Sequence, residues 1–224
     1  MDKMTFNRLI TPYNRTLRTD KKNEWLTIHY VGAVSSAENN AKYFYNAYRG
    51  ASAHYFVDEK SIWQVVEDRD DAWHVGGAKK YYNKCRNNNS IAIEMCCKKD
   101  AKGEWYFEEA TIENALWLSA LICKKYNIDI SYVTTHYLTT HKNCPAPFVK
   151  NPSLWEDFKN RLEAMMMEEE KELTTQEKCK EVQRIGNFDD NTGLYFQFYR
   201  HNVPLIDKLY KMAIDCEKWR NGQK

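Results

Sequence analysis

Residues 108–136, EEATIENALWLSALICKKYNIDISYVTTH, contain the clearest helix of the chain and, directly after it, a predicted strand. Apolar side chains recur in the first part at three- and four-residue steps, as on one face of an α-helix: Ile112, Leu116, Leu118, Leu121 and Ile122. Residues 130–136 are rich in β-branched and aromatic side chains, which favour a strand. A helix that leads into a strand indicates a layered α/β or α+β fold.

The flanking segments continue this alternation of strands and helices. Residues 25–31 (WLTIHYV) and 87–97 (NNNSIAIEMCC) predict buried strands, the second one after a polar turn. Residues 53–66 form two alternating runs around the sequence DEKS, which is typical of a hairpin. Two further helices are predicted, over residues 35–48 with a serine at the N-cap and over residues 154–166.

The pattern changes after the last of these helices. Residues 165–175 (MMMEEEKELTT) contain a charge run, which suits a linker or an exposed helix. We therefore predict a domain over residues 1–165, a linker over 166–175 and a small all-α module over 176–224. Because three short helices make only a marginal core, this module is expected to dock onto a partner or onto a second copy of the chain.

Composition and charge exclude several classes of protein. The formal net charge of +2 gives no reason to expect a nucleic-acid or membrane partner, and no apolar run approaches the roughly 20 residues of a membrane span. The N-terminal residues lack the apolar core of a secretory signal, so we expect synthesis in the cytoplasm and a separate route of exit. The seven cysteines, with Cys96 and Cys97 adjacent, indicate buried thiols rather than a disulfide framework.

Three side chains with zinc-binding chemistry stand out. They are His29 in a predicted strand, His136 at the end of another, and Cys144 in the loop that follows. Catalytic zinc usually has three protein ligands and one open position. His141 and Cys144 are spaced almost as suitably as His136 and Cys144, so spacing alone leaves the two histidines as alternatives. The structural alternative is a core histidine, two exposed histidines and a buried thiol.

The order of five motifs along the chain, TIHYVG, AHYFVD, AWHVGG, NSIAIEMC and THYLTTHKNCP, resembles that of the zinc-dependent N-acetylmuramoyl-L-alanine amidases of type 2. This family shares its fold with the peptidoglycan recognition proteins, and the amidase domains of phage endolysins are the most similar members. The resemblance covers about residues 20–162. It implies a central mixed β-sheet flanked by helices, with the C-terminal module outside the shared fold.

The resemblance also implies roles for individual residues. The family's zinc ligands match His29, His136 and Cys144, and His141 matches none of them. Glu94 matches the residue that takes a proton from the attacking water and delivers it to the leaving nitrogen. Lys142 matches a residue that stabilises negative charge on the carbonyl oxygen.

Four residues are expected near the substrate. In the segment DDAWHVGG, the residues Trp73, His74 and Gly76 match the family's substrate groove. His54 matches a strand position near the zinc, where it would shape the cleft, support a zinc ligand or serve the structure.

The function implied by the resemblance is hydrolysis of bacterial cell-wall peptidoglycan. An enzyme of this family, with Zn²⁺ as cofactor, cleaves the amide between N-acetylmuramic acid and the L-alanine of the stem peptide. The expected setting is that of a phage endolysin, made in the host cytoplasm and released with the help of a holin. The C-terminal module would bind the cell wall or mediate self-association. The alternative is a peptidoglycan-binding protein of the same fold that does not catalyse hydrolysis.

Overall fold

The structure, a computed structural model, describes residues 4–171 of the chain. Residues up to Met166 form one compact unit. The helical module predicted for residues 176–224, together with its suggested roles in wall binding and self-association, lies outside the described residues. Residues 172–175 of the predicted linker also lie outside them.

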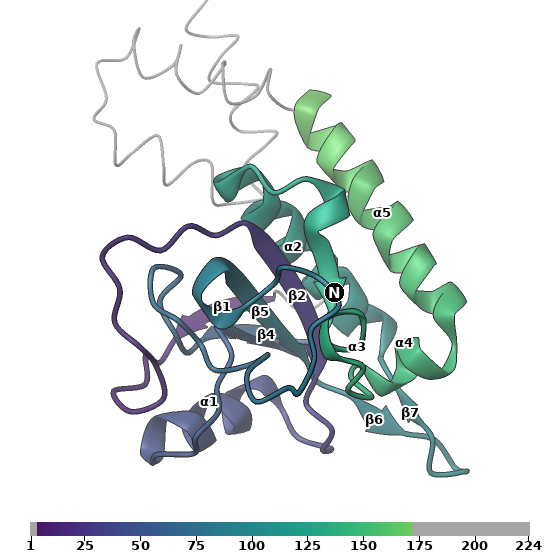
Figure 1. The fold of residues 1–224 in the computed structure, drawn as a ribbon. Coiled ribbons are helices and arrows are strands. Elements are labelled where there is room, and N and C mark those ends of the chain that lie inside the picture. Colours follow the sequence, from purple (N-terminus) through teal and green to yellow (C-terminus); the bar gives the residue numbers. More distant parts are fainter. Residues whose placement is uncertain (1–3, 172–224) are drawn as a thin grey trace, which may run out of the picture. The chain divides into compact units, whose positions relative to one another are not determined.

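The compact unit is built on a six-stranded mixed sheet (Figure 1). In their order across the sheet, the strands are β1 (Thr5–Arg8), β4 (Ser61–Gln64), β3 (Tyr55–Val57), β5 (Ser90–Met95), β2 (Trp25–Tyr30) and β8 (Val133–Thr135). Strands β3 and β4 are antiparallel, as predicted for a hairpin, and all other neighbouring strands are parallel. The mixed sheet that the resemblance implies is therefore confirmed.

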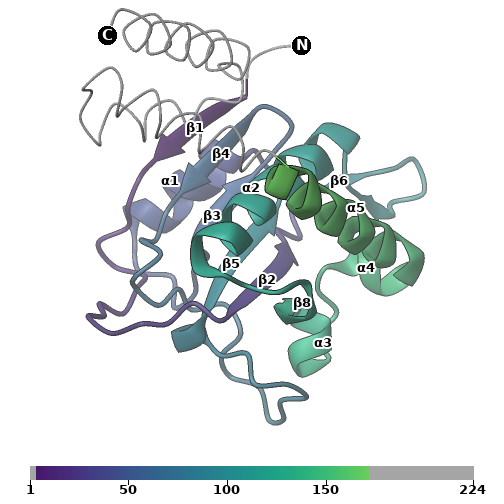
Figure 2. The same cartoon turned by 90° about the horizontal axis from the view of Figure 1, so that it is seen from above.

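Helices cover both faces of this sheet. Helices α2 (Glu109–Tyr126) and α5 (Pro152–Lys171) lie on one face, and α1 (Ala37–Asn46) lies on the other (Figure 1, Figure 2). Because successive strand side chains point to opposite faces, Ile28 and Ile93 belong to the apolar core under α2 and α5. Their neighbours in sequence point toward the opposite face.

The ends of the helices follow from local side-chain chemistry. The Oγ of Ser36 accepts a hydrogen bond from the backbone N–H of Asn39 at 3.2 Å, which confirms a serine N-cap for α1. The Oδ2 of Asp58 accepts another from the N–H of Ala37 at 2.7 Å. Helix α2 ends where Asn127 adopts the left-handed conformation with φ of 54°.

The strand predicted for residues 130–136 is wrong in its extent. Residues Ile130–Tyr132 form a 3₁₀ turn, because Asp129 accepts a hydrogen bond from the N–H of Ser131 at 2.8 Å. Strand β8 then has only three residues. His136 begins the short helix α3 (His136–Thr140), whose N-cap is the hydroxyl of Thr135. His136 is therefore in the first turn of a helix and not at a strand end.

Several short elements were not predicted, because each has too few residues for a periodic pattern: strand β1, helix α4 (Ala146–Lys150) and the hairpin of β6 (Lys98–Lys99) with β7 (Trp105–Tyr106). The helix predicted for residues 154–166 is longer than expected. Helix α5 runs to Lys171, since the glutamates of the predicted linker are good helix formers. Across the described residues, no helix combines the length and the apolar character needed to cross a membrane.

Candidate active site

The site begins with two strand residues that lie side by side. His29 and Glu94 are register partners on the parallel strands β2 and β5. Ile28 and Ile93, which precede them, point into the core under α2 and α5, so His29 and Glu94 project from the other face. Since both residues are near the carboxyl ends of parallel strands, they lie at the same edge of the sheet.

Helix α3 and the loop that follows it bring two more donor groups to His29. The N–H of Tyr137 donates to the carbonyl oxygen of Cys144 at 2.8 Å, which folds the loop back onto the start of the helix. The Sγ of Cys144 lies 3.5 Å from the Nδ1 of His29, and the rings of His29 and His136 have centroids 4.9 Å apart. One ligand atom from each of these three buried residues lies within 4.8 Å of the others.

The protonation states of these groups fit a Zn²⁺ ion. Burial lowers the pKa of His29 well below its usual value, and burial together with Lys142 lowers the pKa of His136 to about 4. Both imidazoles are therefore neutral near pH 7 and keep a lone pair for a metal. Burial raises the pKa of the Cys144 thiol, so the thiolate requires a cation beside it. Two neutral imidazoles and one thiol are a donor set that zinc prefers.

Glu94 has an unpaired oxygen beside this cluster. Its side chain is half-buried, and Oε2 is buried without a hydrogen-bond partner among the described residues. Burial raises the pKa of Glu94 to about 8, while the charge of Lys142 acts in the opposite direction. A carboxylate held in this way is ready to exchange a proton with a reactant.

His141, the alternative that spacing left open, is not part of this cluster. It ends α3 in the left-handed conformation, with φ of 64°, and its side chain is exposed. Its ring stacks on Tyr82, with centroids 3.6 Å apart and an interplanar angle of 13°, and on Tyr137, with centroids 5.3 Å apart. The exposed residue Lys142 follows directly.

His74 and His54, which are expected near the substrate, are both buried, and their ring nitrogens face other groups of the protein; their contact with substrate stays a prediction. His74 is 8% exposed, and its ring nitrogens face His29 Nε2 and Ser90 Oγ, each at 3.0 Å. His54 is fully buried, and its Nδ1 accepts the N–H of Ala92 at 3.0 Å. The Nε2 of His54 lies 3.1 Å from the carbonyl oxygen of Asp70.

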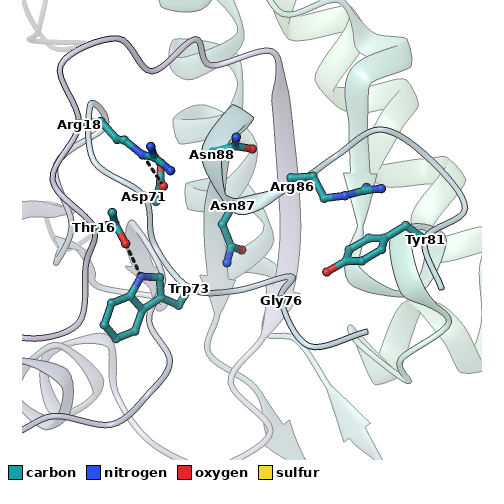
Figure 3. A pocket seen from close by; sticks show the side chains of 9 residues that line it. All are labelled: Thr16, Arg18, Asp71, Trp73, Gly76, Tyr81, Arg86, Asn87 and Asn88. Carbon is teal, nitrogen blue, oxygen red and sulfur yellow. Dashed lines mark hydrogen bonds and ion pairs between the residues drawn. The ribbon is translucent and has the colours of Figure 1, made fainter. Parts of the chain in front are cut away.

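Trp73 and Gly76, the other two expected substrate residues, do line an open pocket of about 290 Å³. The Nε1 of Trp73 donates to the Oγ1 of Thr16 at 2.9 Å, and Trp73 and Tyr81 lie on opposite sides of Asn87 and Gly76 (Figure 3). The full lining is Thr16, Arg18, Asp71, Trp73, Gly76, Tyr81, Arg86, Asn87 and Asn88. Aromatic faces and planar polar groups give this pocket the means to hold a polar ligand.

Sequence reasoning did not identify the part that residues 86–90 play. The Oδ1 of Asn87 accepts the N–H groups of both His74 and Val75, at 3.1 and 2.9 Å, and so holds the wall of the pocket. The guanidinium of Arg86 lies over the ring of Tyr81, 3.7 Å from its centroid. The only sequence signal is the polar turn before β5, which predicts a turn and names no partner for its side chains.

Known proteins resemble this chain in sequence. The family described as N-acetylmuramoyl-L-alanine amidase matches residues 19–147. The chain is 33% identical over 178 residues to the N-acetylmuramoyl-L-alanine amidase BlyA of Bacillus subtilis, an alignment that covers 72% of this chain and 47% of BlyA. It is 28% identical over 151 residues to the N-acetylmuramoyl-L-alanine amidase CwlL of Bacillus licheniformis, covering 63% of this chain and 41% of CwlL. The chain thus spans about half the length of the curated relatives it matches.

Solved structures share the fold. A mutant endolysin from Bacillus subtilis is 26% identical, with a TM-score of 0.58, and the match covers 72% of this chain and 99% of that one. The catalytic domain of XlyA, at 24% identity and a TM-score of 0.58, supports the fold alone, with 71% of this chain and 99% of that one covered. On the match to residues 19–147 and the shared fold, the chain belongs to the N-acetylmuramoyl-L-alanine amidase family.

Proposed function

We propose that this protein is a zinc-dependent amidase that hydrolyses the amide between the lactyl group of N-acetylmuramic acid and the L-alanine of the peptidoglycan stem peptide. Membership of the amidase family supports the reaction class. The observation that carries the proposal is the convergence of His29, His136 and Cys144 beside Glu94, whose Oε2 is buried and unpaired. A site that only bound peptidoglycan would have no need for this costly carboxyl group.

The residues of the chain divide the chemistry between them. His29, His136 and Cys144 would hold the zinc ion, which supplies a Lewis acid that polarises the carbonyl group and lowers the pKa of water. Glu94 accepts the proton of the attacking water and transfers it to the leaving nitrogen. Its pKa of about 8 in the metal-free chain falls when a cation lies nearby, which favours the ionised form at the start of the reaction. Lys142 offsets the negative charge that develops on the carbonyl oxygen.

The pocket beside Trp73 is the proposed location of part of the substrate. Trp73 and Gly76 are one and two positions from His74 in sequence, and His74 contacts His29, so the segment that lines the pocket is connected to the metal centre. Trp73 offers an aromatic face, and Arg86 and Asn88 offer hydrogen-bond donors to sugar or peptide groups.

We also propose that the protein acts as a phage endolysin, made in the host cytoplasm and reaching the wall when a holin opens the membrane. The similarity to a solved endolysin at 26% identity supports the endolysin part of this proposal. Wall binding or self-association by residues 176–224 is part of the same proposal, with peptidoglycan as the partner.

Digestion of defined peptidoglycan with the zinc-loaded full chain tests the reaction. The expected products are stem peptides with free L-alanine amino termini and glycan strands without new reducing ends, identified by mass spectrometry. If the protein binds the same peptidoglycan but releases no such peptides, the non-catalytic alternative is correct.

A further inference from the structure

The ring of His29 is connected to a buried chain of hydrogen bonds that leads away from the metal centre. His29 Nε2 lies 3.0 Å from His74 Nδ1, His74 Nε2 lies 3.0 Å from Ser90 Oγ, and Ser90 Oγ lies 2.5 Å from the carbonyl oxygen of Arg86. The side chains are almost fully withdrawn from solvent, with exposed fractions of 1% for His29, 8% for His74 and 0% for Ser90.

The direction of each hydrogen bond follows from its final acceptor. A carbonyl oxygen only accepts, so the hydroxyl of Ser90 donates to Arg86. The oxygen of Ser90 then accepts from His74, which places a proton on His74 Nε2. A neutral His74 has a lone pair on Nδ1, which accepts the proton of His29 Nε2.

This direction determines which nitrogen of His29 can bind a metal. With its proton on Nε2, the neutral ring has its lone pair on Nδ1, and Nδ1 is the atom that lies 3.5 Å from Cys144 Sγ. The opposite arrangement would place a proton on Nδ1, directed at the ligand cluster, and would prevent coordination. Both rings are buried, which favours their neutral form.

The hydrogen-bonded series His29, His74 and Ser90, here called the relay, is also held through its backbone. Asn87 accepts hydrogen bonds from the N–H groups of His74 and Val75. Asn87 and Ser90 belong to one short segment, so the same few residues fix both the position of His74 and its proton.

We propose that His74 and Ser90 are positioning residues that hold the Nε2–H tautomer of His29, so that Nδ1 of His29 is the zinc ligand. The inference rests on the proposed function for the identity of the metal. Ligand histidines commonly donate their second N–H to an outer acceptor, and losing such a partner typically weakens metal affinity roughly 10–100-fold. Here the acceptor is a second neutral histidine, whose own tautomer is set by a serine.

The tautomers can be measured without any substitution. The zinc-loaded full chain, labelled with ¹⁵N in its histidines, is examined by two-bond ¹H–¹⁵N NMR, with assignments from single histidine variants. The expected spectrum shows the proton of both His29 and His74 on Nε2. A proton on Nδ1 of His74, or coordination of zinc through Nε2 of His29, would overturn the proposal.

Variants at His74 test its consequence for metal affinity. His74→Phe keeps the bulk of the ring but has no acceptor, and we expect zinc affinity, measured by competition with a chelator, to fall roughly 10–100-fold. His74→Asn places Oδ1 near the position of Nδ1 and should restore most of that affinity. Wild-type affinity in a folded His74→Phe chain contradicts the proposal.

A pair of serine variants provides the matched control. Ser90 and Ser119 are both fully buried, and each donates to a backbone carbonyl oxygen, Ser119 to that of Ala115 at 2.7 Å. Ser90→Ala should weaken zinc binding, and Ser119→Ala should leave it unchanged; equal effects of the two would argue against the relay. If the unmodified chain binds no zinc, the proposed function itself fails. That result differs from the variant effects above, which assume that the unmodified chain binds zinc.

Discussion

His29 and Glu94 are direct register partners on two parallel strands, β2 and β5. One contributes to a buried cluster of metal-binding groups, and the other presents an unpaired carboxylate oxygen beside it. Since neighbouring strands in a sheet are about 4.8 Å apart, backbone pairing alone keeps the proposed proton acceptor close to the metal centre. Sheet register thus fixes this part of the site independently of the loops.

Glu94→Gln separates catalysis from metal binding. The amide has nearly the shape of the carboxylate but cannot accept the proton, so we expect kcat to fall by about 10²- to 10⁴-fold. Zinc content, measured by elemental analysis, should stay at one ion per chain, because His29, His136 and Cys144 are untouched. A variant that keeps its turnover would remove Glu94 from the mechanism.

Lys142→Met removes a charge and keeps most of the aliphatic stem. Loss of one group that stabilises the developing negative charge typically costs roughly 10²- to 10³-fold in kcat, and we expect an effect of this size with zinc content unchanged. Lys102→Met, at another exposed lysine in the turn between β6 and β7, is the control and should retain full activity. If the two variants have similar kinetics, Lys142 has no role in catalysis.

Cys144→Ala should release the metal. Losing a ligand is expected to weaken zinc affinity by more than the roughly 10–100-fold that follows from losing an outer hydrogen-bond partner. Because metal binding is coupled to folding, the gain in thermal stability on adding zinc should also disappear. Cys123→Ala removes another buried thiol, from α2 in the core on the opposite face of the sheet, and should keep its zinc. Normal zinc content in Cys144→Ala would contradict the proposed ligand set.

The sequence predicted the strands because they depend on local patterns, whereas the set of three donors came from the resemblance. His29 and Glu94 lie in segments rich in β-branched residues, and the two register partners follow from the parallel pairing of those segments. The resemblance favours His136 over His141, and His136 does lie with His29 and Cys144, but its place at the start of a helix was not predicted. Asp129 and Thr135 cap local turns there, and those side-chain hydrogen bonds override strand propensity.

The direction of loop side chains could not be predicted. Trp73, His74 and Gly76 are close in sequence, yet Trp73 and Gly76 line the pocket while His74 turns inward to His29. What turns His74 inward is its pairing with Ser90, sixteen residues later, at the first position of β5. The local sequence around a serine at the start of a strand does not indicate a hydrogen-bond partner sixteen residues away.

Metal-free protein should show an abnormal dependence of stability on pH through Glu94. The pKa of Glu94 is raised from 4.5 to about 8 in the folded chain, so between these values the folded state binds more protons than the unfolded state. The free energy of unfolding therefore falls as pH rises through this window, by at most about 1.4 kcal/mol per pH unit.

Glu94→Gln lacks this titration, which makes it the reference for the same measurement. In urea unfolding with chelator present, the stability of Glu94→Gln relative to the unmodified chain should increase from about pH 4.5 to about pH 8 and then level off. A constant difference between the two proteins across this range would mean that the pKa of Glu94 is ordinary.

Leu162→Ala tests whether α5 belongs to the amidase unit. Leu162 is fully buried and packs in the same core as Trp155 and Phe158, so its truncation should lower the free energy of unfolding by about 2–5 kcal/mol. Leu154 lies on the same helix with 43% of its surface exposed, and Leu154→Ala should change stability by no more than about 0.5 kcal/mol. Urea unfolding of both full-length variants, followed by tryptophan fluorescence, measures the difference. Equal, small effects would show that α5 contributes little to the core, and the boundary of the amidase unit would then lie before Pro152 rather than near Met166.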